Sequence, residues 1–179
     1  MEKEKISQIA KKLCQAPKGI LAADESTNTI KKRLDSIKVA SNFESRRDYR
    51  ELLFKAKGIK DYISGVILYD ETIKQEGSDG IPFTKFLSNN NIIPGIKVDK
   101  GALPLSSGLD EKITEGLDGL SNRLTEYKSL GAKFTKWRAI IEINNEKKIP
   151  SDYCIHSNVF MLARYARIVQ DNGMVPIVE

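Results

Sequence analysis

Short apolar segments alternate five times with stretches of helical periodicity, and this alternation constrains the fold more than any other feature of the sequence. The apolar segments are near-continuous runs of Ile, Val and Ala, which are typical of parallel strands covered on both faces. Strand and helix in repeated succession predict right-handed βαβ units and a parallel sheet. The five expected strands are Gly19–Asp24, Tyr62–Tyr69, Ile92–Val98, Ala132–Ile141 and Met174–Glu179.

The segments between the expected strands carry signals for the beginning and end of helices. Ser41 and Glu44 have the spacing of a capping box, and residues 82–89 predict a shorter helix. Two longer stripes of apolar residues, at spacings of three and four, each end at a glycine. The stripes are Leu117, Leu120, Leu124, Tyr127 and Leu130 before Gly131, and Ile155, Val159, Leu162, Ala163, Ala166 and Val169 before Gly173.

The 179 residues contain no Gly/Ser-rich linker, so we expect residues 1–179 to form one domain, or part of one, with no second domain. Both a doubly wound sheet and an unfinished eight-stranded barrel fit the alternation of an α/β fold. The phosphate-binding fingerprints of nucleotide-binding sheets, GxGxxG and GxxxxGK[ST], do not follow any expected strand. Gly101, Gly108, Gly116 and Gly119 are interpreted as turn and cap glycines.

Composition excludes several classes of function. The net charge of +5 is spread along the chain rather than gathered with aromatic residues, which disfavours nucleic-acid binding. Cys14 and Cys154 are far apart and lack CxxC spacing, as expected in a reducing, cytoplasmic compartment. The sequence shows no signal peptide and no transmembrane run, so no membrane association is expected. His156 is the only histidine, which excludes a His-rich zinc site, and we expect no metal and no cofactor.

Charged residues gather where the expected strands end. In a (β/α)8 barrel the catalytic groups come from the carboxyl ends of several strands, so this distribution indicates a site. Because side chains alternate along a strand, Lys136 and Arg138 share a face that Trp137 does not. The residues at the strand ends are Asp24, Glu25, Asp70, Glu71, Lys97, Asp99, Lys136, Arg138 and Glu179.

Each of these residues also has a purely structural interpretation. A carboxylate after a strand is often the N-cap of the next helix, which is the favoured reading for Asp70 and Glu71. Lys97 could reach the solvent without any function. Burying Lys136 and Arg138 without anionic partners would be costly, and the candidate partners are Asp24, Glu179 and a substrate phosphate.

The residue types alone suggest chemistry on a phosphorylated carbonyl compound. Lysines and an arginine bind phosphate and oxyanions, and carboxylates move protons. A lysine that is desolvated or crowded by cations has a depressed pKa and can form a Schiff base with a carbonyl.

Six motifs occur along the sequence in a fixed order: GILAADEST (Gly19–Thr27), GVILYDET (Gly65–Thr72), GIKVDKG (Gly95–Gly101), GLDGL (Gly116–Leu120), KWR (Lys136–Arg138) and VPIVE (Val175–Glu179). With these motifs the sequence resembles class I fructose-bisphosphate aldolases of the animal and plant type, from about Lys5 to Glu179. The resemblance implies an incomplete (β/α)8 TIM barrel, the N-terminal half of a domain that family members complete with further strands.

The resemblance implies an activity in glycolysis and gluconeogenesis. Family members reversibly cleave fructose 1,6-bisphosphate into dihydroxyacetone phosphate and glyceraldehyde 3-phosphate, through a lysine Schiff base and without metal or cofactor. By the same resemblance we expect a cytoplasmic protein that forms a homo-oligomer, a tetramer, when full length.

Roles carry over only to the residues that match the family motifs. Asp24 is similar to the carboxylate that helps to deprotonate the C4 hydroxyl group. Lys136 resembles the lysine that stabilises charge beside the Schiff base. Glu179 matches the glutamate that acts as acid and base when the carbinolamine loses water.

Four further positions resemble substrate-binding residues of the family. Lys97 and Arg138 match residues that line the substrate site. Arg33 and Arg46 correspond to arginines that contact the sugar bisphosphate.

The sequence departs from the family at two loop positions and in length. Asn28 and Thr29 stand where relatives usually have Gly and Ser. Family chains are about twice as long, and their Schiff-base lysine lies on the sixth strand, so this chain alone is expected to be inactive. Two alternatives stay open: a transaldolase-like enzyme in which Lys136 is the Schiff-base residue, and a non-catalytic half-barrel that binds anions.

Overall fold

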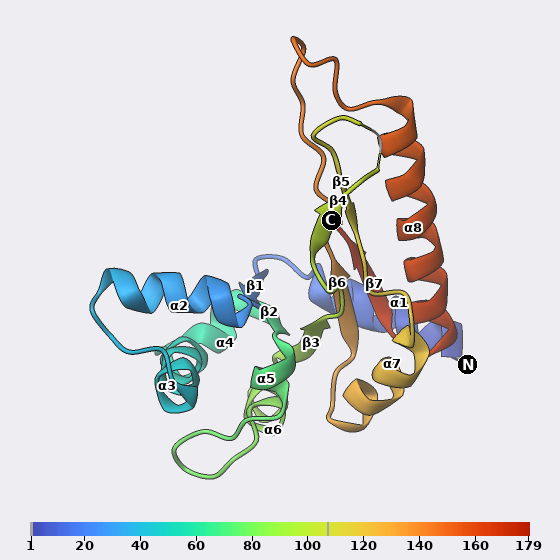
Figure 1. Ribbon diagram of the computed structural model, residues 1–179. Coiled ribbons are helices and arrows are strands. Elements are labelled where there is room, and N and C mark those ends of the chain that lie inside the picture. Colours follow the sequence, from blue (N-terminus) through green and yellow to red (C-terminus); the bar gives the residue numbers. More distant parts are fainter. Residues whose placement is uncertain (1, 107) are drawn as a thin grey trace.

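The computed structural model describes residues 2–106 and 108–179, and a parallel sheet of five strands forms its centre (Figure 1). The strands follow one another in the order β1-β2-β3-β6-β7, with every neighbouring pair parallel. No reversal of strand order occurs, so the sheet is a curled half-barrel and the doubly wound alternative is wrong. The strands are β1 (Gly19–Ala23), β2 (Ile63–Leu68), β3 (Ile93–Lys97), β6 (Phe134–Trp137) and β7 (Val175–Val178).

Helices cover the outer face of the sheet, and α1 packs against the inner face. On the inner face, Leu13 at the end of α1 joins Ile67, Phe134 and Val175 in one apolar cluster. A larger apolar cluster lies between the outer face and the other helices. Within it the rings of Trp137 and Tyr165 are in contact, with their centroids 5.2 Å apart. The helices are α1 (Glu2–Leu13), α2 (Thr27–Ser36), α3 (Phe43–Phe54), α4 (Ile59–Tyr62), α5 (Asp70–Ile73), α6 (Phe83–Asn89), α7 (Leu120–Ser129) and α8 (Asp152–Asp171).

The fourth strand is shorter than the expected segment Ala132–Ile141, because β6 ends at Trp137. Beyond it the backbone makes one more sheet-like contact, from the amide of Ala139 to the carbonyl of Glu179 at 2.8 Å. Ile141 then lies on the surface with 44% of its area exposed. Of the apolar residues after Trp137, Ala139 therefore still packs against the core, whereas Ile141 belongs to the surface.

The first turn of α3 is capped one residue later than the sequence suggested. Asn42 is the N-cap: its Oδ1 accepts a hydrogen bond of 2.7 Å from the amide of Ser45. The hydroxyl of Ser45 in return accepts a bond of 3.0 Å from the Asn42 amide. The capping box thus uses Asn42 and Ser45, and the expected pair of Ser41 and Glu44 is wrong.

The buried face of α8 differs from the expected stripe, whereas that of α7 agrees with it. Polar side chains anchor α8: Asn158 donates to the carbonyl of Lys112 at 3.1 Å, and the Tyr165 hydroxyl donates to that of Ile177 at 3.1 Å. Satisfied polar groups can be buried, so they occupy core positions that the expected stripe did not include. From that stripe, Val169 is buried, and Leu162 and Ala166 are partly buried against the core. Ile155 and Val159 are exposed. The buried residues of α8 are Cys154, Asn158, Met161, Tyr165 and Val169, and those of α7 are Leu120, Leu124 and Tyr127.

An antiparallel hairpin that the sequence analysis did not predict lies between β3 and α7. Its strands are β4 (Ala102–Pro104) and β5 (Lys112–Thr114), and it rises beyond the carboxyl ends of the parallel strands (Figure 1). The glycines before and after it have positive φ angles, 98° at Gly101 and 130° at Gly116, as expected for turn glycines. None of the helices in the described parts of the chain is long and apolar enough to cross a membrane.

Candidate active site

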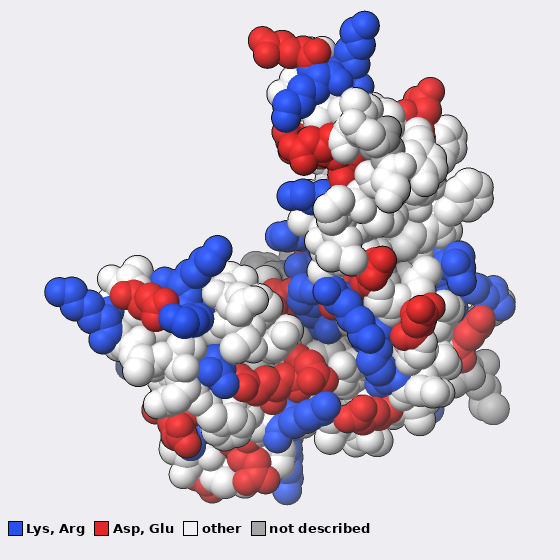
Figure 2. Space-filling model, viewed as in Figure 1, with Lys and Arg blue, Asp and Glu red and all other residues white. Residues whose placement is uncertain are grey.

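A cavity of about 940 Å³ opens at the carboxyl ends of the parallel strands. Each of the five parallel strands contributes a lining residue that lies within the strand or directly after it, as the barrel fold predicts. Six of the seven site residues expected from the sequence line it, and charged side chains of both signs surround the hollow (Figure 2). These six are Asp24, Arg33, Lys97, Lys136, Arg138 and Glu179.

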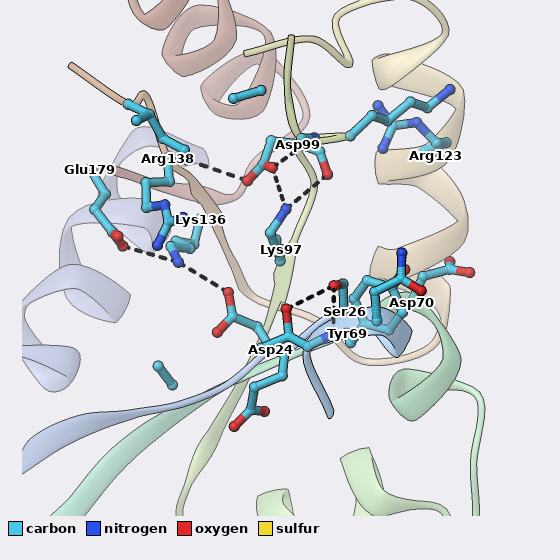
Figure 3. Close-up of a pocket in the computed structure, with 18 of the residues that line it drawn as sticks. Asp24, Ser26, Tyr69, Asp70, Lys97, Asp99, Arg123, Lys136, Arg138 and Glu179 are labelled. Carbon is cyan, nitrogen blue, oxygen red and sulfur yellow. Dashed lines mark hydrogen bonds and ion pairs between the residues drawn. The ribbon is translucent and has the colours of Figure 1, made fainter. Parts of the chain in front are cut away.

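Lys136 lies among the charged groups of the cavity (Figure 3). It links the two edge strands of the sheet, because it contacts Asp24, which follows β1, and Glu179, which follows β7. Its Nζ lies 3.0 Å from Asp24 Oδ2 and 3.1 Å from Glu179 Oε2. Only 6% of Lys136 is exposed. Burial acts to lower the pKa of Lys136, but attraction and hydrogen bonds from the two carboxylates outweigh it and raise that pKa. Lys136 is therefore held protonated.

Lys97 lies beside Lys136, because the parallel register pairs these two residues of β3 and β6. The ammonium group of Lys97 forms an ion pair with the carboxylate of Asp99. It also donates a hydrogen bond of 3.2 Å to the backbone carbonyl of Asp99. The like charges of the two lysines are thus compensated by different carboxylates, Asp99 for Lys97 and both Asp24 and Glu179 for Lys136.

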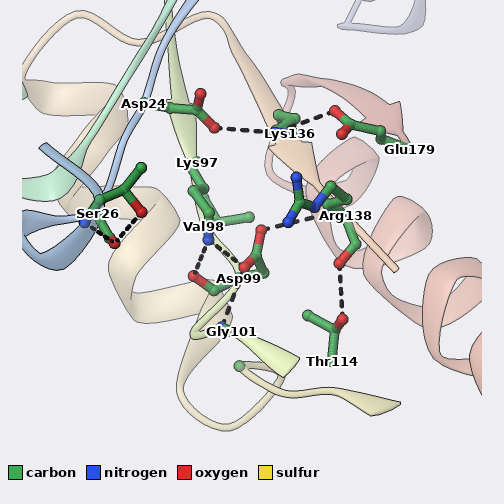
Figure 4. Close-up of polar contacts among 12 residues, drawn as sticks. Asp24, Ser26, Lys97, Val98, Asp99, Gly101, Thr114, Lys136, Arg138 and Glu179 are labelled. Carbon is green, nitrogen blue, oxygen red and sulfur yellow. Dashed lines mark hydrogen bonds and ion pairs between the residues drawn. The ribbon is translucent and has the colours of Figure 1, made fainter. Parts of the chain in front are cut away.

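Asp99 also ties the end of β3 to the end of β6 (Figure 4). Its carboxylate accepts a hydrogen bond of 3.3 Å from the amide of Arg138 and one of 3.1 Å from the amide of Gly101. The carbonyl of Arg138 accepts a bond of 2.7 Å from the hydroxyl of Thr114. Among the described residues, no carboxylate pairs with the guanidinium of Arg138, so this cation is open to an anionic ligand.

Arg33 reaches the cavity from α2, at the rim. Its guanidinium pairs with Glu25, which follows Asp24, and donates a hydrogen bond of 2.9 Å to the hydroxyl of Tyr49. More than half of the Arg33 side chain is exposed, so the group is accessible from the cavity.

Arg46 does not line the cavity. Both carboxylate oxygens of Glu71 accept hydrogen bonds from it, at 2.8 Å from Nε and 2.7 Å from Nη2. This bidentate pair joins α3 to α5 and leaves Arg46 occupied. A role of Arg46 in substrate binding stays a prediction.

The capping interpretation of Asp70 and Glu71 is wrong. The N-cap of α5 is Tyr69, and no side-chain hydrogen bond caps that helix. Asp70 instead accepts a hydrogen bond of 2.8 Å from the hydroxyl of Tyr127 and lies 3.1 Å from the amine of Lys74. Both carboxylates hold neighbouring elements together.

Two residues of α7 line the cavity that sequence reasoning had assigned no role in it. Burial and the hydrogen bond to Asp70 raise the pKa of Tyr127 to about 12, so it is a neutral donor. Arg123 donates a bond of 2.8 Å to the carbonyl of Val98 and a second bond to that of Gly116. The sequence analysis placed Tyr127 in an apolar stripe, and Arg123 belongs to none of the motifs, so no local pattern distinguished them.

Candidate metal ligands are not gathered in this site. Among the side chains that the structure describes, those of residues 5–106 and 108–179, no three of His, Cys, Asp or Glu are grouped in a way that would hold a metal ion. His156 is exposed on α8, where its ring Nδ1 lies 2.7 Å from the carbonyl of Asp152.

Comparison with known proteins gives one family. The family model described as class I fructose-bisphosphate aldolase matches residues 5–179. A probable class 1 fructose-bisphosphate aldolase from Xanthomonas campestris is 51% identical over all 179 residues, which correspond to 53% of that relative. The fructose-bisphosphate aldolase of Plasmodium falciparum is 52% identical over 176 residues, 98% of this chain and 48% of that relative.

A solved structure agrees with the sequence comparisons. A ternary co-crystal structure of the Plasmodium falciparum fructose-bisphosphate aldolase, in complex with TRAP and a small-molecule inhibitor, superimposes with a TM-score of 0.97 at 52% identity. The match covers 99% of this chain and 51% of that one. The chain spans about half the length of the relatives it matches. It belongs to the class I fructose-bisphosphate aldolase family.

Proposed function

We propose that the protein to which this chain belongs reversibly cleaves fructose 1,6-bisphosphate between C3 and C4. The observation that carries this proposal is the buried Lys136 held between Asp24 and Glu179 at the carboxyl end of the sheet. A protonated lysine between two carboxylates suits a reaction in which a proton leaves one oxygen and charge develops nearby. Family membership supports the same reaction.

Cations around the cavity suit the phosphate groups of this substrate. Arg138 has a guanidinium without a carboxylate partner, and Arg33 is accessible at the rim. Guanidinium groups bind phosphate oxygens with paired, charge-assisted hydrogen bonds. In our proposal these arginines and Lys97 bind and orient the sugar bisphosphate, and Arg46 would join them only by leaving Glu71.

The carboxylates divide the proton transfers between them. Asp24 accepts the proton of the C4 hydroxyl as the C3–C4 bond breaks, and C4 becomes the aldehyde carbon of glyceraldehyde 3-phosphate. The electron pair of the broken bond moves toward C2, where an iminium formed with a lysine accepts it. Glu179 moves the protons that accompany formation and loss of the carbinolamine. Lys136 stabilises the negative charge that develops between these groups.

Lys136 itself does not form the iminium in this proposal. A lysine nucleophile must be neutral, and the two carboxylates raise the pKa of Lys136. The raised pKa of Lys136 therefore disfavours the transaldolase-like alternative. We place the Schiff-base lysine outside this chain, so the chain alone binds the substrate without cleaving it.

The pathway, the compartment and the oligomeric state are proposed from the family and from the exposed surface of the chain. We propose a glycolytic enzyme of the cytoplasm, where the free thiols of Cys14 and Cys154 remain reduced. We also propose that the complete protein is a homotetramer. Ile143 and Phe160 have 79% and 69% of their areas exposed, and a subunit contact would cover such apolar groups.

Isothermal titration of this chain with fructose 1,6-bisphosphate tests the proposed substrate. Binding is expected, fructose without phosphates should bind at least about tenfold more weakly, and Arg138→Gln should weaken bisphosphate binding about tenfold. Lys57→Gln, an exposed position outside the cavity, is the matched control and should leave binding unchanged. Equal affinity for fructose and its bisphosphate would contradict the proposal.

A further inference from the structure

Two arginines share the carboxylate of Glu25, the residue after Asp24. Arg33 of α2 forms an ion pair with Oε1, and Nη1 of Arg50 on α3 lies 3.0 Å from Oε2. The Glu25 side chain is only 10% exposed, so its charge needs a cation close by. A single cation would be enough to neutralise the Glu25 carboxylate, so the second arginine is not needed for charge balance in this loop.

The two arginines differ in their surroundings. The Arg33 side chain is 54% exposed and lines the cavity. That of Arg50 is 2% exposed and is fixed by a hydrogen bond of 2.8 Å from Nη2 to the carbonyl of Glu25. Tyr49 lies between them: its hydroxyl accepts from Arg33, and its ring centroid lies 5.4 Å from the guanidinium carbon of Arg50. Arg33 is therefore accessible to a ligand in the cavity, whereas Arg50 is enclosed by the protein.

Arg50 also has donors that are not in use. Its Nε and Nη1 are buried without a hydrogen-bond partner, and so is Glu25 Oε2. Nη1 and Oε2 are close enough to attract each other as charges but are not aligned as donor and acceptor. A small rotation of the carboxylate would bring it into a paired, hydrogen-bonded contact with Arg50.

We propose that Arg50 is a positioning residue that neutralises Glu25 when Arg33 leaves it to bind a substrate phosphate. Without Arg50, departure of Arg33 would strand a buried carboxylate next to Asp24, so Arg33 would stay bound to Glu25. With Arg50, the exposed and weakly held Arg33 is released at little cost. The phosphate-binding role of Arg33 rests on the proposed function, whereas the sharing of Glu25 does not.

A stability measurement without ligand tests the sharing. Arg33→Ala should lower the melting temperature by about 1 °C in the parent chain, because Arg50 takes over Glu25, but by about 4 °C or more in Arg50→Gln. Arg50→Lys, which keeps the charge and loses the planar pair of donors, should give an intermediate shift. Equal shifts caused by Arg33→Ala in all three backgrounds would overturn the proposal.

Binding of fructose 1,6-bisphosphate tests the release of Arg33. Arg50→Gln should raise the dissociation constant about tenfold, and the added change Glu25→Gln should restore it to within about twofold, because no charge then retains Arg33. In an Arg33→Ala background, Arg50→Gln should have no effect on binding. Arg47→Gln, on the same helix and paired with Asp48, is the control for an arginine lost elsewhere.

The outcomes separate this inference from the proposed function. If Arg50→Gln weakens binding equally with and without Arg33, Arg50 only supports the fold, and the inference is wrong. If the parent chain does not bind the bisphosphate at all, the proposed function fails, and the ligand-free stability cycle alone decides whether Arg33 and Arg50 share Glu25.

Discussion

Lys136 of β6 donates a hydrogen bond of 3.0 Å to Asp24, although the two residues are 112 positions apart in the sequence and β2 and β3 lie between their strands. Neighbouring strands are about 4.8 Å apart, so a flat sheet would separate these strands by roughly 14 Å. Only a sheet that curls toward its inner face brings the two side chains together. This contact is therefore both a consequence of barrel curvature and the centre of the site.

Replacing Lys136 by Met should destabilise the chain. The change leaves Asp24 and Glu179 near each other without their shared cation, and losing one partner of a buried ion pair costs about 3 kcal/mol. Urea unfolding at pH 7 measures the difference. Arg167→Met, which breaks the exposed pair with Asp171, is the control and should change the free energy of unfolding by less than about 0.5 kcal/mol.

The pH dependence of the Lys136 contribution has a fixed sign. The pKa of Lys136 is raised in the folded chain, so the ion pair stabilises the fold fully below the unfolded pKa of about 10.4. The contribution is lost as the pH rises through the still higher folded pKa. The difference between parent and Lys136→Met should therefore stay constant from about pH 7 to 9 and shrink only above about pH 10.5. A difference that shrinks between pH 7 and 9 would show that Lys136 is not held protonated.

Glu51 should stabilise the chain with the opposite pH dependence. Its carboxylate pairs with Lys55 at 2.6 Å and accepts hydrogen bonds from the amide and hydroxyl of Ser78, and these contacts lower the pKa of Glu51 despite its burial. Glu51→Gln should cost about 1.5 kcal/mol at pH 7. The difference should persist above about pH 4.3 and vanish as the pH falls through the lower folded pKa. Urea unfolding at a series of pH values measures the difference in unfolding free energy between the parent and Glu51→Gln. A difference that does not change with pH would contradict the prediction.

Gly95 should not tolerate a side chain. A Cβ atom at this position of β3 would lie 2.3 Å from the ring of Phe134, inside the inner apolar cluster. Gly95→Ala should therefore lower the unfolding free energy by about 2–3 kcal/mol. Gly19→Ala, where no atom lies within 4 Å, is the control on the same sheet. A second change, Phe134→Leu, should recover part of the loss, and no recovery would show that the clash is not with that ring.

The parallel direction of the strands could be predicted from the sequence because apolar runs and helical stripes alternate along it. Their sequential order followed from the family resemblance, since the alternation alone also fits a doubly wound sheet. The exact buried face of α8 could not be predicted, because Asn158 and Tyr165 are buried through hydrogen bonds to carbonyl groups that are distant in the sequence. A stripe of apolar residues carries no information about such partners. Val159→Ser should accordingly change stability by less than about 0.5 kcal/mol, and Met161→Ala should cost about 2 kcal/mol, as urea unfolding can check.

The site, too, has residues that could be predicted from the sequence and contacts that could not. Five of its residues were found because family motifs and strand ends coincide, as for Asp24 and Lys136, whereas Arg33 on α2 was found from the family resemblance alone. The bidentate contact that removes Arg46 from the cavity depends on Glu71 in another helix, and the role of Arg123 depends on backbone carbonyls at Val98 and Gly116. These contacts form only when α3, α5 and α7 are placed around the sheet.

Reductive trapping can distinguish a protonated, charge-stabilising Lys136 from a Lys136 that is the Schiff-base nucleophile. The chain would be incubated with dihydroxyacetone phosphate and borohydride, and peptides mapped by mass spectrometry, with a full-length family member treated in parallel as the positive control. The account predicts an adduct on the full-length protein and none at Lys136 of this chain. A stoichiometric adduct at Lys136 would contradict it.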